Sequence, residues 1–142
     1  MKEYHTKTTI KRPISEVWQQ LVDFPNYKNW NPLVKNITGD IREGGQIITD
    51  IVPLNKAYSA KLLSFKPNQE MIWKGKQVAE FLMAGKHYYQ LKSIDENTTE
   101  LLHGEYFTGL ASWFIPTSLL NKMKNSFIAH NETLKQLVEH GK

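Results

Sequence analysis

The C-terminal part of the chain carries the pattern that most constrains the fold. After Pro116, apolar residues recur at spacings of three and four over about five helical turns, which is typical of one amphipathic helix. These residues are Leu120, Met123, Phe127, Leu134, Leu137 and Val138. A helix of about 25 residues is roughly 37 Å long, about the span of a small domain. Gly141 is placed to end it.

The middle of the chain has a different pattern. From residue 34 to 110, short segments rich in β-branched and aromatic residues alternate with turn signals such as Gly39-Asp40 and Pro67-Asn68. Two longer strands are expected at about 85–94 and 98–110, joined as a hairpin. This pattern predicts an antiparallel meander. Because neither the sheet nor the helix can bury its apolar face alone, the helix must lie across the sheet.

The N-terminal part predicts a strand followed by two short helices. Residues 3–11 carry β-branched and aromatic side chains without helical periodicity, and Pro13 ends this strand. Ser15 is the expected N-cap of the first helix. Pro25 suits the first turn of a second helix that reaches about Asn29. The expected fold class is therefore α+β.

Composition limits the class of protein. At 142 residues, with no shift in composition along the chain, one domain over 1–142 is expected. There is no cysteine, which excludes disulfides and thiol chemistry and fits a reducing compartment, so we expect a cytoplasmic protein. The N-terminus lacks the apolar core of a signal peptide, and no run approaches the roughly 20 apolar residues of a membrane span.

Neither nucleic acid nor a cofactor is expected as a partner. The net charge of +4 is spread along the chain, and the only adjacent basic pair is Lys11-Arg12, whereas a nucleic-acid protein gathers its charge in a patch. The five histidines show no metal-binding spacing, and no glycine-rich run suits a phosphate. No serine lies within the nucleophile-elbow motif of hydrolases, so covalent hydrolysis is not supported. We therefore expect no metal and no cofactor.

Strand alternation separates the two faces of the late hairpin. His87, Tyr89 and Leu91 share one parity, and the positions between them are more polar, so the first set is expected to face the helix. The same argument turns His103 and Glu105 inward from the partner strand. Buried imidazoles and carboxylates are costly unless paired. The pattern fits either a satisfied structural network or a polar anchor for a ligand, with Glu105 beside His103 or His87.

Several stretches resemble a known superfamily. The segments Ile14-Ser15-Glu16-Val17-Trp18, Asp23-Phe24-Pro25-Asn26-Tyr27 and Trp30-Asn31-Pro32, followed by Gly39, resemble the opening of the SRPBCC superfamily, which includes polyketide cyclase/dehydrase-like proteins, START domains and Bet v 1-like proteins. The later segment His87-Tyr88-Tyr89-Gln90-Leu91, and then Thr99 to His103, Glu105, Phe107 and Gly109, are similar to the polyketide cyclase-like branch.

The resemblance implies the helix-grip fold, in which a curved antiparallel sheet of about six or seven strands wraps around a long C-terminal helix. It also implies a cavity between helix and sheet, but no universal catalytic motif. The leading hypothesis is an internal site for a small hydrophobic or aromatic molecule. The residues expected to bind it are Trp30, Trp73, Phe81, His87, Tyr89, His103, Glu105, Phe107, Trp113, Met123 and Phe127.

Two other functions stay open. One is a cyclase or dehydratase that uses the same cavity, with Glu105, His103 and His87 as candidate catalytic residues. The other is a protein-interaction module, and a homodimer is possible. The segment from Phe81 to Met83 is expected to be either a mobile flap over the cavity or a contact patch. Trp30 is expected either to line the cavity mouth or to cap the core.

Overall fold

The computed structural model describes residues 2–76 and 84–141. The strands are β1 (Lys2–Ile10), β2 (Val34–Gly39), β3 (Gln46–Ile51), β4 (Lys56–Lys66), β5 (Glu70–Lys76), β6 (Ala84–Asp95) and β7 (Thr98–Thr108). The α-helices are α1 (Ile14–Leu21) and α2 (Thr117–His140). Three short 3-10 helices complete the described part: η1 (Phe24–Asn29), η2 (Val52–Leu54) and η3 (Leu110–Phe114).

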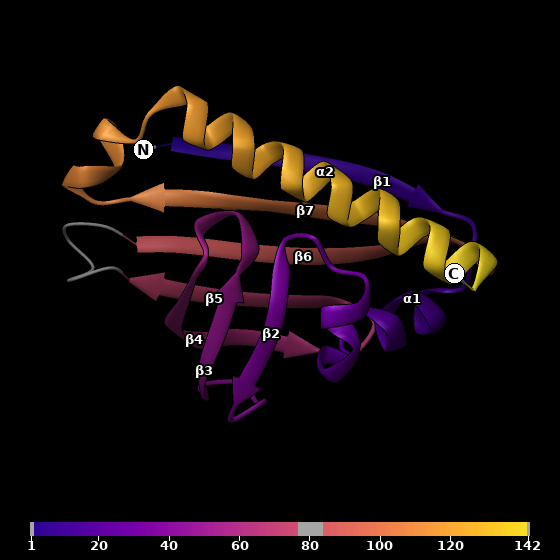
Figure 1. The fold of residues 1–142 in the computed structure, drawn as a ribbon. Helices are drawn as coiled ribbons and strands as arrows, with labels where there is room; N and C mark the ends of the chain where they lie inside the picture. Colours follow the sequence, from indigo (N-terminus) through magenta and orange to yellow (C-terminus); the bar gives the residue numbers. More distant parts are fainter. Residues whose placement is uncertain (1, 77–83, 142) are drawn as a thin grey trace.

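The strands form one antiparallel sheet in the order β1-β7-β6-β5-β4-β3-β2. From β2 to β7 each strand pairs with the next along the chain, as a meander does. β1 pairs with β7 at one edge, and α1 and η1 carry the chain from β1 to β2 at the opposite edge (Figure 1). The expected α+β helix-grip architecture is confirmed.

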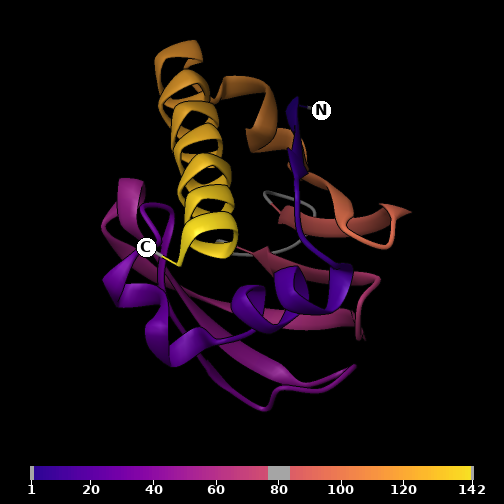
Figure 2. The same cartoon turned by 90° about the vertical axis from the view of Figure 1, so that its right-hand side faces the viewer.

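The helix α2 lies along the inner side of the curved sheet (Figures 1 and 2). Its buried side chains are Met123, Phe127, His130, Asn131 and Leu134, and their spacing places them on one face of the helix. Gly141 adopts the left-handed conformation, with φ of 72°, and its N–H bonds to the carbonyl of Leu137, so the helix ends where the sequence predicts. No helix in the described part is long and apolar enough to cross a membrane.

Two details of the predicted elements are wrong. The N-cap of α1 is Pro13 rather than Ser15, because the N–H groups of Glu16 and Val17 already bond to the Pro13 carbonyl and Ser15 falls inside the first turn. The last strand ends at Thr108 instead of 110, because Gly109 takes a φ of 95° and turns the chain into η3.

The connection from η1 to β2 is held by a buried side chain. Asn31 is buried, and its Oδ1 accepts hydrogen bonds from the backbone N–H groups of Leu33 and Val34, each at 2.9 Å. This arrangement satisfies two backbone donors where the chain leaves η1. It fixes the position of Leu33, which lies beside the cavity described next.

Candidate functional site

Two neighbouring rows of side chains cross the sheet and point toward α2. In the first row, Trp73 on β5, His87 on β6 and Glu105 on β7 are direct cross-strand partners. In the second row, two residues further along β6, Tyr89 lies opposite His103. Side chains at partnered positions of antiparallel strands project from the same face. We call the first set the cavity row and the pair Tyr89 and His103 the sealed row.

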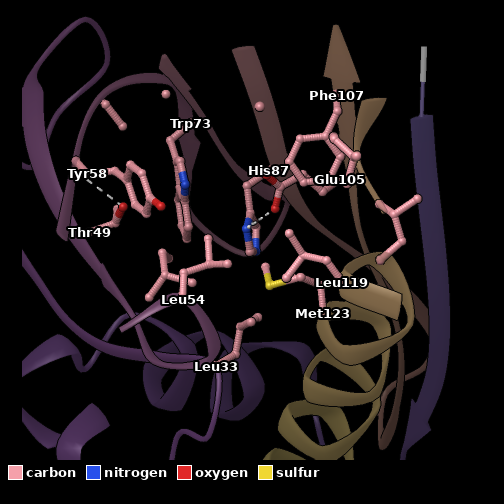
Figure 3. Close-up of a pocket in the computed structure, with 16 residues that line it drawn as sticks. Leu33, Thr49, Leu54, Tyr58, Trp73, His87, Glu105, Phe107, Leu119 and Met123 are labelled. Carbon is pink, nitrogen blue, oxygen red and sulfur yellow. Dashed lines mark hydrogen bonds and ion pairs between the residues drawn. The ribbon is translucent and has the colours of Figure 1, made fainter. Parts of the chain in front are cut away.

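The cavity row borders an internal space of about 190 Å³ between the sheet and the start of α2 (Figure 3). The residues that line it are mostly apolar and come from the position just before β2, from β3 to β7, from η2 and from the segment from 115 to 123. They are Leu33, Thr49, Ile51, Leu54, Tyr58, Ala60, Trp73, Gly75, Gly85, His87, Glu105, Phe107, Ile115, Leu119, Leu120 and Met123. Ionisable groups therefore reach the cavity mainly from one wall.

Five of the expected ligand-binding residues line this cavity. They are Trp73, His87, Glu105, Phe107 and Met123. Three others, Tyr89, His103 and Phe127, are fully buried but lie outside the lining. Which of the eight contact a ligand stays a prediction.

Of the remaining expected residues, two lie outside the cavity lining and one is not among the described residues. The ring of Trp30 packs against Tyr27 and His130, at centroid distances of 5.4 and 5.2 Å, and caps the core. Trp113 on η3 is 65% exposed and does not line the cavity. Phe81, and with it the expected flap or contact patch up to Met83, falls outside the described residues.

Glu105 and His87 form the polar part of the cavity wall. The Oε1 atom of Glu105 lies 3.3 Å from Nδ1 of His87, and both side chains are largely buried. The His87 ring also stacks on the ring of Trp73, with a centroid distance of 4.2 Å and an angle of 23° between the ring planes (Figure 3). A Cβ at Gly85 would come within 2.6 Å of Glu105 Oε2, so the absence of a side chain at Gly85 leaves room for the carboxyl group.

A buried hydrogen-bond chain continues from His87 away from the cavity. Its Nε2 atom lies 2.8 Å from Nε2 of His103, and Nδ1 of His103 lies 2.8 Å from Oδ1 of Asn131 on α2. His130 adds a branch, because its Nδ1 lies 3.1 Å from the same Asn131 oxygen. Its Nε2 atom is 3.2 Å from the hydroxyl of Tyr89. The chain thus connects the cavity wall with the core beneath α2.

Burial sets the charge of the groups in the core. Burial lowers the pKa of His103 well below its usual value, and the neighbouring His130 and His87 lower it further. Burial also lowers the pKa of His130, to about 3, against an opposing effect of its hydrogen bond to Asn131. The pKa of Tyr89 is raised, again chiefly by burial. At neutral pH these three side chains are therefore uncharged.

The sequence analysis missed two members of this chain. His130 and Asn131 were not singled out, although they stand three and four residues after Phe127 on the apolar face of the predicted helix. Polar residues at core positions of a strongly periodic helix are the signal that would have identified them. Among the described residues, no group of three His, Asp or Glu side chains is arranged to hold a metal ion.

The family assignment follows from a match over nearly the whole chain. The profile of the family described as polyketide cyclase/dehydrase and lipid transport matches residues 1–139. The chain belongs to this family. The SRPBCC resemblance is confirmed, and membership supports a ligand-binding or cyclase role in general. No curated protein matches the chain in sequence.

Solved structures with this fold include proteins of different names. The Zhui aromatase/cyclase from Streptomyces sp. R1128 is 11% identical, with a TM-score of 0.74 over 97% of this chain and 93% of that one. A START superfamily protein from Mycobacterium smegmatis is 14% identical, with a TM-score of 0.73 over 99% of both chains. The Aha1 dimer from Colwellia psychrerythraea is 20% identical, with a TM-score of 0.77 over 100% and 99%. At these identities the likeness concerns the fold alone.

Proposed function

We propose that the cavity between sheet and α2 binds a small, largely apolar molecule of one or two rings. The observation that carries the proposal is a space of about 190 Å³ with mostly apolar walls and the Glu105–His87 pair at one side. A cavity of roughly 150 Å³ lined by apolar side chains holds benzene, whereas drug-sized ligands need about 300 Å³ or more. The volume therefore favours a compact ring system.

The walls suit such a ligand chemically. Leu119 and Met123 offer apolar contact from α2, Leu33 and Leu54 offer it from just before β2 and from η2, and Trp73 offers an aromatic face from the sheet (Figure 3). A ligand of about ten non-hydrogen atoms reaches a micromolar dissociation constant if each atom contributes roughly 0.8 kcal/mol, which is within the usual range for small ligands. We expect binding of this order.

Cavity filling tests the proposal. Naphthalene is titrated into the wild-type protein and into the Met123→Trp variant, and binding is followed by NMR shifts of the cavity residues. We expect the added indole to occupy the space and to weaken binding at least tenfold. Lys122→Trp, which adds the same ring at an exposed neighbouring position of α2, is the control. Equal binding by wild type and Met123→Trp would contradict the proposal.

A second candidate function is acid–base catalysis on the bound molecule, as a cyclase or dehydratase requires. It is favoured by the 3.3 Å contact between Glu105 and His87 at the cavity wall, where a proton can pass to or from a bound group. If it is right, turnover of a cyclisation or dehydration substrate depends on pH and is lost in Glu105→Gln, while binding is kept. Full activity in that variant would refute catalysis by this pair.

The possible homodimer, the alternative of an interaction module and the expected cytoplasmic location stay predictions. On η3, Leu110, Trp113 and Phe114 are 66%, 65% and 84% exposed, and exposed apolar groups of this kind are common at contact surfaces. A dimer through η3 would dissociate in a Trp113→Ser, Phe114→Ser double variant, as measured by light scattering. Identical masses for wild type and variant would exclude η3 as the contact.

A further inference from the structure

The hydrogen positions in the buried chain can be deduced from its partners, beginning at Thr6. The hydroxyl of Thr6 donates to the carbonyl oxygen of His103 at 2.5 Å, so its single hydrogen is used there. Thr6 Oγ1 must then accept from Asn131, whose Nδ2 lies 2.7 Å away. The amide orientation of Asn131 is thereby fixed, and its Oδ1 faces His103 and His130 as an acceptor.

The two imidazoles next along the chain follow from this orientation. An uncharged His103 carries one ring hydrogen, which must be on Nδ1 to donate to Asn131. Its Nε2 is then an acceptor, so the facing Nε2 of His87, 2.8 Å away, must carry a hydrogen. Asn131 thus sets the hydrogen on His87 without touching it.

The contact between His87 and Glu105 is therefore constrained. An unprotonated Nδ1 of His87 beside an ionised Oε1 would bring two lone-pair atoms within 3.3 Å in a largely buried place, and their repulsion favours one hydrogen on one of these two atoms. If it is on Nδ1, the carboxyl group is a carboxylate. If it is on Oε1, Oε2 is a carbonyl oxygen. In both cases Oε2 of Glu105 is an acceptor.

This acceptor is available to a ligand. Within residues 2–76 and 84–141, no hydrogen bond or ion pair engages Oε2 of Glu105, and Glu105 lines the cavity. The hydroxyl of Thr49, also in the lining, donates to the carbonyl of Tyr58 at 3.3 Å and so also offers an acceptor. The Tyr58 side chain lies on the far side of Trp73 from His87 (Figure 3).

We propose that the cavity selects ring compounds that carry a hydroxyl or N–H group, and that this group donates to Oε2 of Glu105. The inference rests on the proposed ligand-binding function and narrows its ligand class to phenols, alcohols and ring N–H compounds. Ring carboxylates are disfavoured, because their charged oxygens would lie against the acceptor Oε2 of Glu105 within a low-polarity space.

The test is a series of four probes of one ring size: 2-naphthol, 2-methoxynaphthalene, naphthalene and 2-naphthoate, titrated at pH 7 by calorimetry or NMR. Phenols titrate near pH 10, so 2-naphthol keeps its hydrogen. We expect 2-naphthol to bind about tenfold more tightly than both donor-free analogues, one larger and one smaller than itself, since one buried hydrogen bond has about this effect. Naphthoate should bind most weakly.

Glu105→Met keeps the length of the side chain and removes both oxygens. We expect the preference for 2-naphthol over naphthalene to fall to threefold or less while naphthalene binding is kept. Glu100→Met, at an outward-facing position of β7, is the control and should keep the tenfold preference.

The outcomes separate the two proposals. If no probe binds, the proposed function fails and the donor inference fails with it. If naphthalene and 2-methoxynaphthalene bind as tightly as 2-naphthol, or naphthoate binds best, the function stands and the inference is wrong. A full preference in Glu105→Met would also overturn it.

Discussion

The cavity row and the sealed row lie side by side on the same strands, yet they differ in what covers them. Glu105 and His87 border open space, whereas His103 and Tyr89, two residues further along, are fully covered, with His130 and Asn131 of α2 bonded to them. Both rows contain a histidine that faces the helix. The difference lies in the helix residues above each row, because His130 and Asn131 form hydrogen bonds with the sealed row, whereas the cavity separates the other row from α2.

The largest expected contrast is between two phenylalanines, one in each environment. Phe127 is fully buried and stacks on His103 at 4.2 Å, so Phe127→Ala should lower the free energy of unfolding by about 4 kcal/mol. Phe107 lines the cavity and is half-buried, so Phe107→Ala should cost about 1 kcal/mol and mainly weaken naphthalene binding. Urea denaturation and naphthalene titration measure the two effects. A greater loss of stability for Phe107→Ala would contradict the assignment of the rows.

The next contrast is between two asparagines of α2. Asn131 is buried and hydrogen-bonds to Thr6, His103 and His130, so Asn131→Ala removes three hydrogen bonds at once and should cost about 3 kcal/mol. Asn125 is exposed on the same helix, and Asn125→Ala should be neutral or slightly stabilising because alanine favours helix. Chemical denaturation of both variants measures the contrast. Equal stabilities would show that the buried chain adds nothing to the fold.

A smaller effect comes from pH. The pKa values of His103 and His130 are lowered in the folded state, so below about pH 6.5 the unfolded chain binds more protons and the free energy of unfolding falls. For two such histidines the loss between pH 7 and pH 5.5 is about 2 kcal/mol, and above pH 7 these groups add no further change.

Denaturation at a series of pH values checks this slope. His140→Asn, at an exposed position, should leave the slope unchanged, whereas His130→Asn should remove about half of it. A stability that is constant from pH 7 to pH 5.5 would be inconsistent with two buried neutral histidines.

Much of the fold could be predicted because periodicity reports it directly. The spacing of Met123, Phe127 and Leu134 fixed the long helix, and the turn signals separated the strands. The alternation of side chains along the strands also predicted that His87 and Glu105 face the helix. These are local properties of the chain, and each can be read within one element.

The position of the cavity could not be predicted in the same way. It depends on where α2 stops covering the sheet, which leaves Glu105 at the lining but places Tyr89 and Phe127 outside it. It also depends on Leu33, just before β2, and on Leu54 in η2, which both line the cavity. Contacts between elements distant in sequence decide both points, and no periodicity within one element records them.

The central claim is that the buried hydrogen bonds of Asn131 and His103 determine that Nε2 of His87, at the cavity wall, carries a hydrogen. Nitrogen-15 NMR of the histidine rings at pH 7 tests it most directly, because it distinguishes Nδ1–H from Nε2–H in each ring. The account predicts hydrogen on Nδ1 alone in His103 and His130, and hydrogen on Nε2 in His87. A hydrogen on Nε2 of His103 would contradict it, since Nε2 of His87 would then have to accept and the ring hydrogen of His87 would be on Nδ1.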